Sequence, residues 1–170
     1  MDVLEKTSKQ YFKELRVLHL ALLIGQIVIA AILYYLASGD KMTKGLDASD
    51  VLRYIVPGVM IFGFIGSSFI FKKLVNKAKG MTELKDKLGL YRGALIAKWA
   101  LLEGPTLIGI MLFYIFNNLT FLLMAGAMLA YFATTGTSIE KAIEDLSLNL
   151  DEQARIRRPD EIVAKINARR

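Results

Sequence analysis

Glu103 is the residue of this chain whose type and position could most directly do chemistry. It lies in the middle of a 24-residue apolar run from Gly93 to Phe116, in which Lys98 is the only other charged residue. At a helical rise of about 1.5 Å per residue, Glu103 lies roughly 15 Å into the run, near the middle of a bilayer core about 30 Å thick. Lys98 lies nearer the start of the run, where its long stem can reach the headgroups. An acid at mid-membrane depth is costly, and it therefore predicts a functional site.

The residues that follow Glu103 predict a break in the helix beside the acid. Pro105 has no backbone N–H, and its ring crowds the carbonyl of Leu101, which predicts a kink and an unpaired acceptor. Gly104 lets another backbone approach closely. A carboxyl group beside a loosened carbonyl predicts an ion or proton site, which the hydroxyl of Thr106 can join.

Gln26 is the predicted partner of Glu103. It lies nine residues into an earlier apolar run, at about the same depth in the bilayer. Its amide can donate to the carboxylate or accept from the protonated acid. Three roles fit such a pair: handling of a proton or cation, a structural hydrogen bond between helices, and contact with a lipid or small ligand.

Four apolar blocks must position these residues. The chain has 170 residues, of which 54% are apolar, and a mean hydropathy of +0.41. The apolar residues are concentrated in blocks that approach the length of a membrane helix. The first block is too long for the core of a signal peptide and follows acidic residues, which favours an uncleaved helix. We predict an all-α fold, a four-helix transmembrane bundle over residues 17–136 with helices at 17–37, 54–71, 93–116 and 119–136.

Short helices are predicted on both flanks of this bundle. In residues 1–16, apolar residues recur at helical spacing between lysines, which predicts an interfacial amphipathic helix. Residues 137–170 are predicted to form a cytoplasmic helical tail, with a capping box from Thr137 to Glu140 and a second helix beginning at Pro159. Two interpretations of the tail stay open, a solvated extension and a docking site for a protein partner.

The distribution of charge predicts the topology. The net charge is +6, and Lys and Arg gather in residues 1–16, in a predicted loop from Lys72 to Arg92, and after Gly136. Positive residues favour the cytoplasmic side, so we expect both termini inside, in a bacterial inner membrane, and no nucleic acid is needed to explain the charge. Four lysines of the predicted loop are either ordinary topology charges or contacts for anionic lipid headgroups: Lys72, Lys73, Lys77 and Lys79.

An internal repeat relates the two halves of the bundle. Residues 19–39 and 98–118 align without gaps with seven identities in 21 positions, and residues 58–64 align with 126–132. This pattern predicts two tandem helical hairpins, each starting from the cytoplasm and related by an axis along the membrane normal. Glu103 aligns with Ile24, so the acid is present in one repeat only.

Small residues predict the faces along which the helices pack, either between repeats or between subunits of a homo-oligomer. Membrane helices rely on such residues for close approach. The two predicted faces lie on the second and fourth helices and consist of Gly63 and Ser67, and of Gly126, Ala130 and Thr134.

The stretch KWALLEGP, from Lys98 to Pro105, resembles the segment around the membrane-buried acid of the proteolipid (c-type) subunits of rotary ATPases. In that family, hairpins form a ring and the acid carries protons or sodium. Here Glu103 is in the first helix of its hairpin, whereas the family's acid is in the second. The chain also resembles uncharacterised four-span bacterial membrane proteins that carry an ALLEGP segment.

Together these patterns predict a small integral membrane protein that handles a proton or cation at Glu103 within an oligomer. The alternative is a non-catalytic accessory or scaffold protein in which Glu103 is a structural hydrogen-bonding residue. The chain has no cysteine, a single histidine and no nucleophile–base pair, so we expect no metal, no cofactor and no enzymatic activity.

Overall fold

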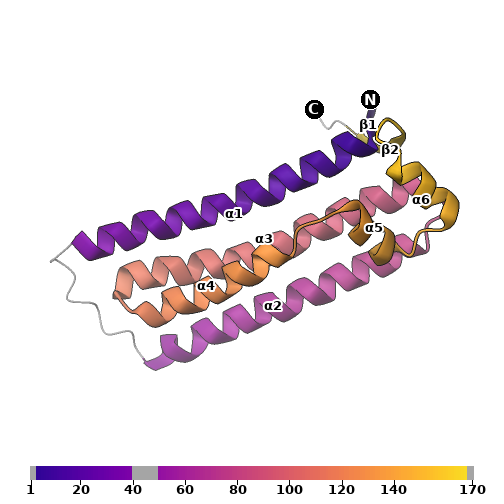
Figure 1. The fold of residues 1–170 in the computed structure, drawn as a ribbon. Helices are drawn as coiled ribbons and strands as arrows, with labels where there is room; N and C mark the ends of the chain where they lie inside the picture. Colours follow the sequence, from indigo (N-terminus) through magenta and orange to yellow (C-terminus); the bar gives the residue numbers. More distant parts are fainter. Residues whose placement is uncertain (1–2, 40–49, 168–170) are drawn as a thin grey trace. The chain divides into compact units, whose positions relative to one another are not determined.

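The computed structural model describes residues 3–39 and 50–167, most of which are helical. Four long helices are followed by two short ones, and a short strand lies near each end of the chain (Figure 1). In chain order the elements are β1 (Val3–Thr7), α1 (Ser8–Gly39), α2 (Asp50–Lys79), α3 (Leu84–Phe116), α4 (Leu119–Thr134), α5 (Ile139–Leu146), α6 (Leu150–Arg157) and β2 (Ile162–Asn167).

Three helices, α1, α2 and α3, are long and apolar enough to cross a membrane, and α4 and α5 make a fourth candidate if they are taken together as one bent span. The helices expose large apolar side chains, with Phe62 77% exposed and Tyr35 78% exposed. Water would oppose so much apolar surface, whereas lipid does not. Both observations are consistent with an integral membrane protein.

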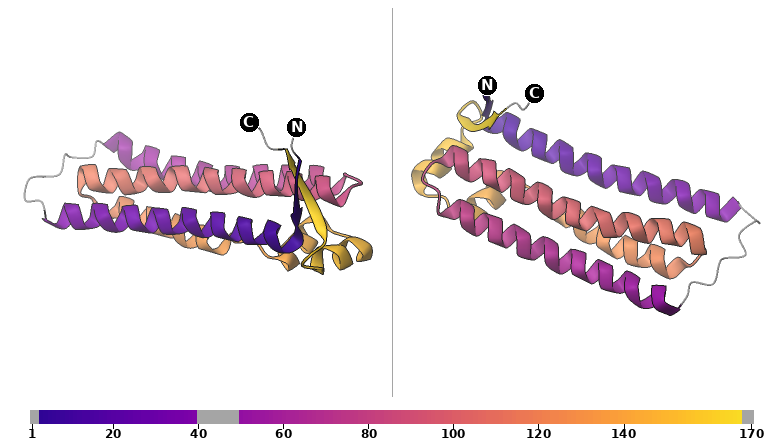
Figure 2. Two further views of the ribbon diagram at one scale, coloured as in Figure 1. Left: turned by 90° about the horizontal axis from the view of Figure 1, so that it is seen from above. Right: turned by 180° about the vertical axis from the view of Figure 1, so that it is seen from behind.

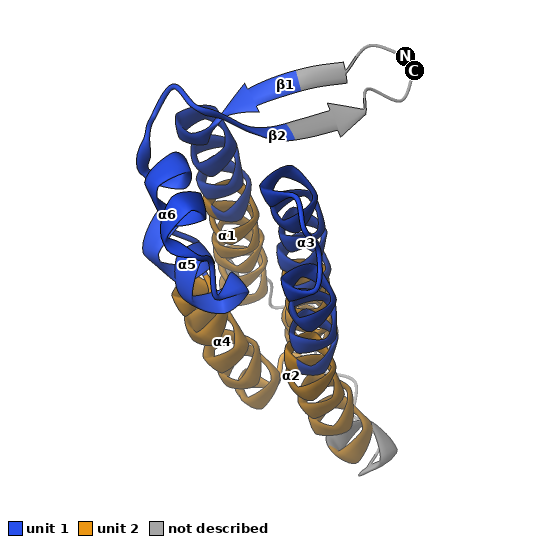
Figure 3. Cartoon of the chain, turned by 90° about the vertical axis from the view of Figure 1, so that its right-hand side faces the viewer, with its two compact units in different colours: residues 1–19, 69–98, 136–170 blue, residues 20–68, 99–135 orange. Residues whose placement is uncertain are grey.

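The chain forms two compact units (Figure 3). Unit 1 comprises residues 1–19, 69–98 and 136–170, and unit 2 comprises residues 20–68 and 99–135. Unit 1 therefore brings together the three basic segments of the sequence. All the Lys and Arg residues belong to it except Lys41, Lys44 and Arg53.

In unit 1 the two ends of the chain lie side by side. Strands β1 and β2 pair antiparallel, from Val3 with Asn167 to Thr7 with Ile162, with an irregularity between Lys6 and Thr7. Its core is formed by buried side chains of α1, α2, α3, α5, α6 and β2, which include Tyr11, Phe12, Leu15, Val75, Ala78, Leu88, Tyr91, Leu146, Ile156 and Val163.

In unit 2, α3 lies between α1 and α2 in both the side view and the view from above (Figures 1 and 2). A Cβ added to Gly109 of α3 would lie against Met60 of α2 and Ala125 of α4, so these three helices approach closely there. The rings of Tyr34 and Phe113 stack with centroids 6.1 Å apart. The two predicted hairpins therefore do not pack as separate pairs, and the tandem-hairpin arrangement is not confirmed.

The predicted interfacial helix over residues 1–16 is wrong. The chain begins with β1, and α1 runs without a break from Ser8 to Gly39. Thr7 and Gln10 form a capping box that starts this helix: Thr7 Oγ1 accepts from the backbone N–H of Gln10 (3.4 Å), and Gln10 Oε1 accepts from that of Thr7 (3.2 Å). No such signal interrupts the helix where the membrane segment was predicted to begin.

The predicted basic loop from Lys72 to Arg92 is also wrong. Helix α2 continues to Lys79 and α3 begins at Leu84, so only residues 80–83 connect them. Apolar side chains at helical spacing, including Val75, Ala78, Leu84 and Leu88, are buried here. Their burial in unit 1 extends both helices beyond their apolar blocks.

The tail differs from its predicted form as well. The first helix is present, although its N-cap is Ser138 and not Thr137. A helix that was not predicted, α6, begins after Asn149, and β2 occupies part of the region where the second tail helix was predicted. Residues of the tail contribute to the core of unit 1, so the interpretation of a solvated extension is wrong.

Candidate functional site

Glu103 lies at the edge of the buried face of α3. Its neighbours Leu102 and Thr106 are fully buried, Gly104 is exposed, and Glu103 itself is half-buried. Among the residues of unit 2 whose side chains the structure describes, Glu103 is the only charged one. It forms no hydrogen bond or ion pair with any described residue. The acid therefore has hydrogen-bonding capacity that its own helix does not use.

Gln26 is 1% exposed and does not bond to Glu103. Its Nε2 donates to the carbonyl of Leu22 in its own helix at 3.2 Å, and its Oε1 is buried with no hydrogen-bond partner. An acceptor left unpaired in an apolar interior is unfavourable because it has lost its bonds to water. The predicted pair is thus not formed, and each of its members keeps an unmet hydrogen-bonding group.

Two buried hydroxyl groups of unit 2 also bond within their own helices. Thr106 Oγ1 donates to the carbonyl of Leu102 at 2.8 Å, and Ser67 Oγ donates to that of Phe64 at 2.8 Å. Such bonds to the preceding turn satisfy a hydroxyl without a partner helix. Thr106 is therefore not part of a network with Glu103.

The carbonyl of Leu101, which Pro105 deprives of its helical partner, is covered by α2. A Cβ added to Gly63 would lie 2.5 Å from Pro105 Cγ and 2.9 Å from the Leu101 oxygen. Only glycine fits at such a distance, and its Cα–H groups can contact the freed carbonyl. Gly63, which was predicted to belong to a packing face, is the residue of α2 that lies against Pro105 and the Leu101 carbonyl of α3. The close approach predicted at Gly104 is not formed, since no atom lies within 4 Å of a Cβ added there.

The predicted packing face of α4 is wrong for contacts within the chain. Gly126, Ala130 and Thr134 are all exposed. The helix instead buries the face formed by Phe121, Ala125, Met128 and Phe132. The small residue that matters is Gly109 of α3, which was not predicted and leaves room for Ala125. Bulky side chains fill the interior, and the small-residue face stays available for contact between subunits.

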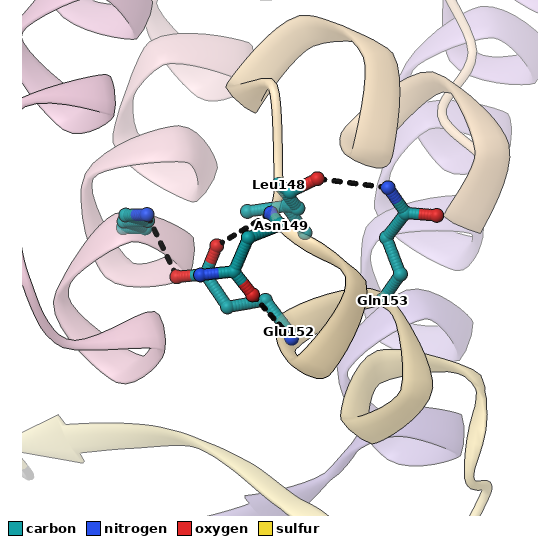
Figure 4. A network of polar contacts seen from close by, with 5 residues as sticks. Leu148, Asn149, Glu152 and Gln153 are labelled. Carbon is teal, nitrogen blue, oxygen red and sulfur yellow. Dashed lines mark hydrogen bonds and ion pairs between the residues drawn. The ribbon is translucent and has the colours of Figure 1, made fainter.

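Unit 1 contains a buried ion pair that joins α3 to α6. Lys87 Nζ lies 2.7 Å from Glu152 Oε1, and the two side chains are 11% and 10% exposed. Glu152 also forms a capping box with Asn149: its Oε2 accepts from the Asn149 backbone N–H at 3.0 Å, while Asn149 Oδ1 accepts from that of Glu152 at 2.9 Å (Figure 4). One carboxylate thus fixes both the start of α6 and its contact with α3.

The environment of Glu152 favours its ionised form. Burial by itself raises the pKa of this carboxyl group, because desolvation disfavours the charge. The hydrogen bonds from Lys87 and from the backbone of Asn149, together with the charge of Lys87, outweigh this effect and hold the pKa below its usual value of 4.5. The ion pair therefore stabilises unit 1 at neutral pH.

Tyrosine and serine side chains complete the connections within unit 1. The hydroxyl of Tyr11 in α1 donates to the carbonyl of Leu88 in α3 at 2.7 Å, and that of Tyr91 in α3 lies 2.8 Å from Asp145 Oδ2 in α5. Ser8 Oγ donates to the carbonyl of Ile156 in α6. The sequence analysis missed this network. The Asn149–Glu152 capping pattern is the one local sequence feature that indicated part of this network, the start of α6.

The four predicted lipid-contacting lysines, Lys72, Lys73, Lys77 and Lys79, are all exposed on α2, and none of them forms an ion pair with a described residue. Lys98 differs from them, because its Nζ lies 4.6 Å from the ring centroid of Phe71 in a cation–π contact. Within the part of the chain that the structure describes, no group of three or more metal-ligating side chains comes together.

Comparisons of the chain with protein-family models, with curated proteins and with solved structures found no match. The resemblance of the Glu103 segment to the proteolipid subunits of rotary ATPases therefore stays a prediction.

Proposed function

We propose that this chain is a small integral membrane protein that binds and releases a proton or cation at Glu103 within an oligomer. The observation that carries the proposal is the unpaired acid: Glu103 is the only charged side chain described in unit 2 and has no hydrogen-bond or ion-pair partner there. An acid that served only to hold helices together would be expected to bond to a neighbouring helix.

Gln26 supplies a group to which the protonated acid could donate. Helices α1 and α3 both run from unit 1 into unit 2, and the Tyr34–Phe113 stack aligns them with an offset of 79 residues. Gln26 then lies about two residues, or roughly 3 Å, from the level of Glu103. The unpaired Oε1 of Gln26 can accept a hydrogen bond from the protonated form of Glu103.

An oligomer would supply the shielding of Glu103 from lipid that the single chain does not provide. Glu103 is half-buried, and the small-residue face of α4 is exposed. A second copy packed against unit 2 would shield the acid from lipid, and closely packed small residues favour such contacts. Release of the proton or binding of a cation would then occur between subunits. The basic segments gathered in unit 1 support placing that unit, with both termini, in the cytoplasm.

Proton flux into proteoliposomes, measured with an enclosed pH-sensitive dye under an imposed potential, tests this function. We expect Glu103→Gln to reduce flux to the level of empty liposomes, because the amide cannot release a proton. Gln26→Leu should reduce it partially. Glu140→Gln, at an exposed position of α5, is the matched control and should leave flux unchanged. Unchanged flux in Glu103→Gln, or no flux with the unaltered chain, would contradict the proposal.

A non-catalytic accessory or scaffold protein is the second candidate. The observation that favours it is the folded unit 1, in which the tail is tied to α1 and α3 by an ion pair and by hydrogen bonds of Ser8 and Tyr91. In that case Glu103→Gln would be silent and Glu103→Leu would impair assembly. The mass of the assembly in lipid nanodiscs distinguishes the two, since the proton-handling proposal expects both variants to assemble.

A further inference from the structure

The exposed surface of α1 changes from basic to apolar within one residue. Lys13 and Arg16 are exposed, and between Val17 and Ile32 the exposed side chains are apolar, with Val17 56% exposed and Leu20 48% exposed. Helix α2 shows the same change in the opposite chain direction, because exposed Phe69 and Ile70 are followed by exposed Lys72 and Lys73.

On α1 and on α2 the exposed surface changes from basic to apolar, and contacts inside unit 1 show that both changes lie beside the same part of α3. The hydrogen bond from Tyr11 to the carbonyl of Leu88 sets α1 beside α3 with an offset of 77 residues, so that Arg16 lies about level with Gly93. The ring of Phe71 lies 6.1 Å from that of Tyr91 and 4.6 Å from Lys98 Nζ, so Phe71 lies between these two residues of α3.

Helix α3 supplies the common level but does not show the change as sharply. Arg92 is half-buried, Ile96, one turn later, is an exposed apolar residue, and Lys98 beside Phe71 is half-buried. Helices α1 and α2 therefore turn from basic to apolar within roughly one helical turn, about 5.4 Å, of a common level. A border of this kind is the surface that a bilayer with phosphate headgroups would complement.

We infer that Arg16, Lys72 and Lys73, defined here as the basic border, bind the headgroups of anionic phospholipids. Their cationic groups lie directly beside exposed apolar residues, so a lipid could place its acyl chains on the apolar surface and its phosphate on the border. Arginine and lysine both bind phosphate through charge-assisted hydrogen bonds. The inference is independent of Glu103.

The structure also divides the four lysines that the sequence singled out. Lys77 and Lys79 lie five and seven residues beyond Lys72 on α2, roughly 7.5 and 10 Å farther from the apolar surface. These distances are about one Debye length at physiological salt, so the attraction of Lys77 and Lys79 for the headgroups is largely screened. Arg16, which the sequence analysis did not include, belongs to the border in their place.

Two variants with the same loss of charge test the inference. Arg16→Gln/Lys72→Gln/Lys73→Gln removes the border, and Lys9→Gln/Lys77→Gln/Lys79→Gln removes three exposed charges away from it. The full chain in detergent micelles is titrated with dioleoylphosphatidylglycerol or dioleoylphosphatidylcholine, and bound lipid is counted by native mass spectrometry. Each border charge is expected to change affinity about fivefold, so the border variant should bind phosphatidylglycerol on the order of a hundredfold more weakly.

The control variant should lose less than about fivefold, and Arg16→Lys/Lys72→Arg/Lys73→Arg should bind nearly as the unaltered chain does, because the charges remain. Equal losses in the border and control variants would overturn the inference, since net charge alone would then explain binding. No preference for phosphatidylglycerol in the unaltered chain would overturn it too. Displacement of lipid by millimolar inorganic phosphate would assign the border to free phosphate and contradict a lipid site.

Discussion

In unit 1 several buried polar side chains bond between elements, whereas in unit 2 Gln26, Ser67 and Thr106 bond to the backbone of their own helices and Trp99 Nε1 donates across to the carbonyl of Thr135. Lys87 of α3 bonds to Glu152 of α6, and Tyr11 of α1 bonds to the carbonyl of Leu88 in α3. Ser8 of α1 bonds to the carbonyl of Ile156 in α6. In unit 2, Gln26, Ser67 and Thr106 all bond to carbonyls three or four residues earlier. Between the helices of unit 2, Gly63 and Gly109 allow close approach, and the ring pairs Tyr34–Phe113 and Phe64–Tyr131 add contacts.

This difference matches the two surroundings that the surface predicts. A unit in water gains from burying apolar side chains, and partners across elements satisfy the polar groups that are buried with them. Helices in lipid have no such hydrophobic gain from association and depend on close packing, while their backbone groups must be satisfied within each helix. Unit 1 should therefore be sensitive to loss of a polar partner, and unit 2 to an added methyl group.

The largest effect is expected from Lys87→Met. It leaves the mostly buried Glu152 without its cation, and breaking a buried pair by removing one partner costs about 3 kcal/mol. Hydrogen–deuterium exchange of the α6 amides measures the loss as faster opening. Lys87→Met/Glu152→Gln should recover most of it. Lys85→Met is the matched control, because Lys85 is more exposed and lies 4.0 Å from Glu5. Equal losses at both lysines would contradict the importance of the buried pair.

A smaller effect is expected from Gly63→Ala. The added Cβ would lie 2.5 Å from Pro105 Cγ, so α2 and α3 must separate, at a cost of about 1–3 kcal/mol. Thermal unfolding in detergent, followed by circular dichroism, measures the change. Gly66→Ala in the same helix meets no atom within 4 Å and should leave the unfolding temperature unchanged. If the two variants unfolded alike, close packing at Gly63 would not hold these helices together.

The smallest effect is a dependence of unit 1 on pH. The pKa of Glu152 is lowered in the folded chain, so its contribution to stability is complete above the unfolded value near 4.5 and is lost as pH falls through the folded pKa. Protease cleavage of the tail should accelerate below about pH 4.5. Glu152→Gln should show a smaller acceleration, while Glu144→Gln, at an exposed position, should follow the unaltered chain. An identical pH profile in all three chains would show that Glu152 does not carry this dependence.

Much of unit 2 could be predicted from local patterns. The apolar blocks predicted long helices, and Gly63 was identified as a contact residue because small residues allow close approach. The same reasoning predicted the face of Gly126, Ala130 and Thr134 on α4 for contacts between repeats or between subunits, and within the chain this face is exposed. Spacing alone does not say whether a stripe of small residues faces a neighbour, and here Phe121 and Phe132 occupy the interior.

Unit 1 was the less predictable part. The Thr7–Gln10 and Asn149–Glu152 capping boxes were readable in the sequence, yet the pairing of β1 with β2 joins residues more than 150 positions apart. Such pairing depends on the path of the chain between the two strands. Likewise, Lys87 is one of eight basic residues in 69–98, and nothing in its neighbours predicts that Glu152 is its partner.

The sequence by itself determined the apolar helices, the depth of Glu103 within its run, and the concentration of positive charge in three segments. These properties are sums over about 20 neighbouring residues, because partition into lipid and helix formation act locally. Only the tertiary structure decided that Glu103 and Gln26 do not bond to each other, that α3 lies between α1 and α2, and that strand β2 of the tail pairs with β1 at the start of the chain. Those outcomes depend on distances between side chains far apart in sequence, which packing alone sets.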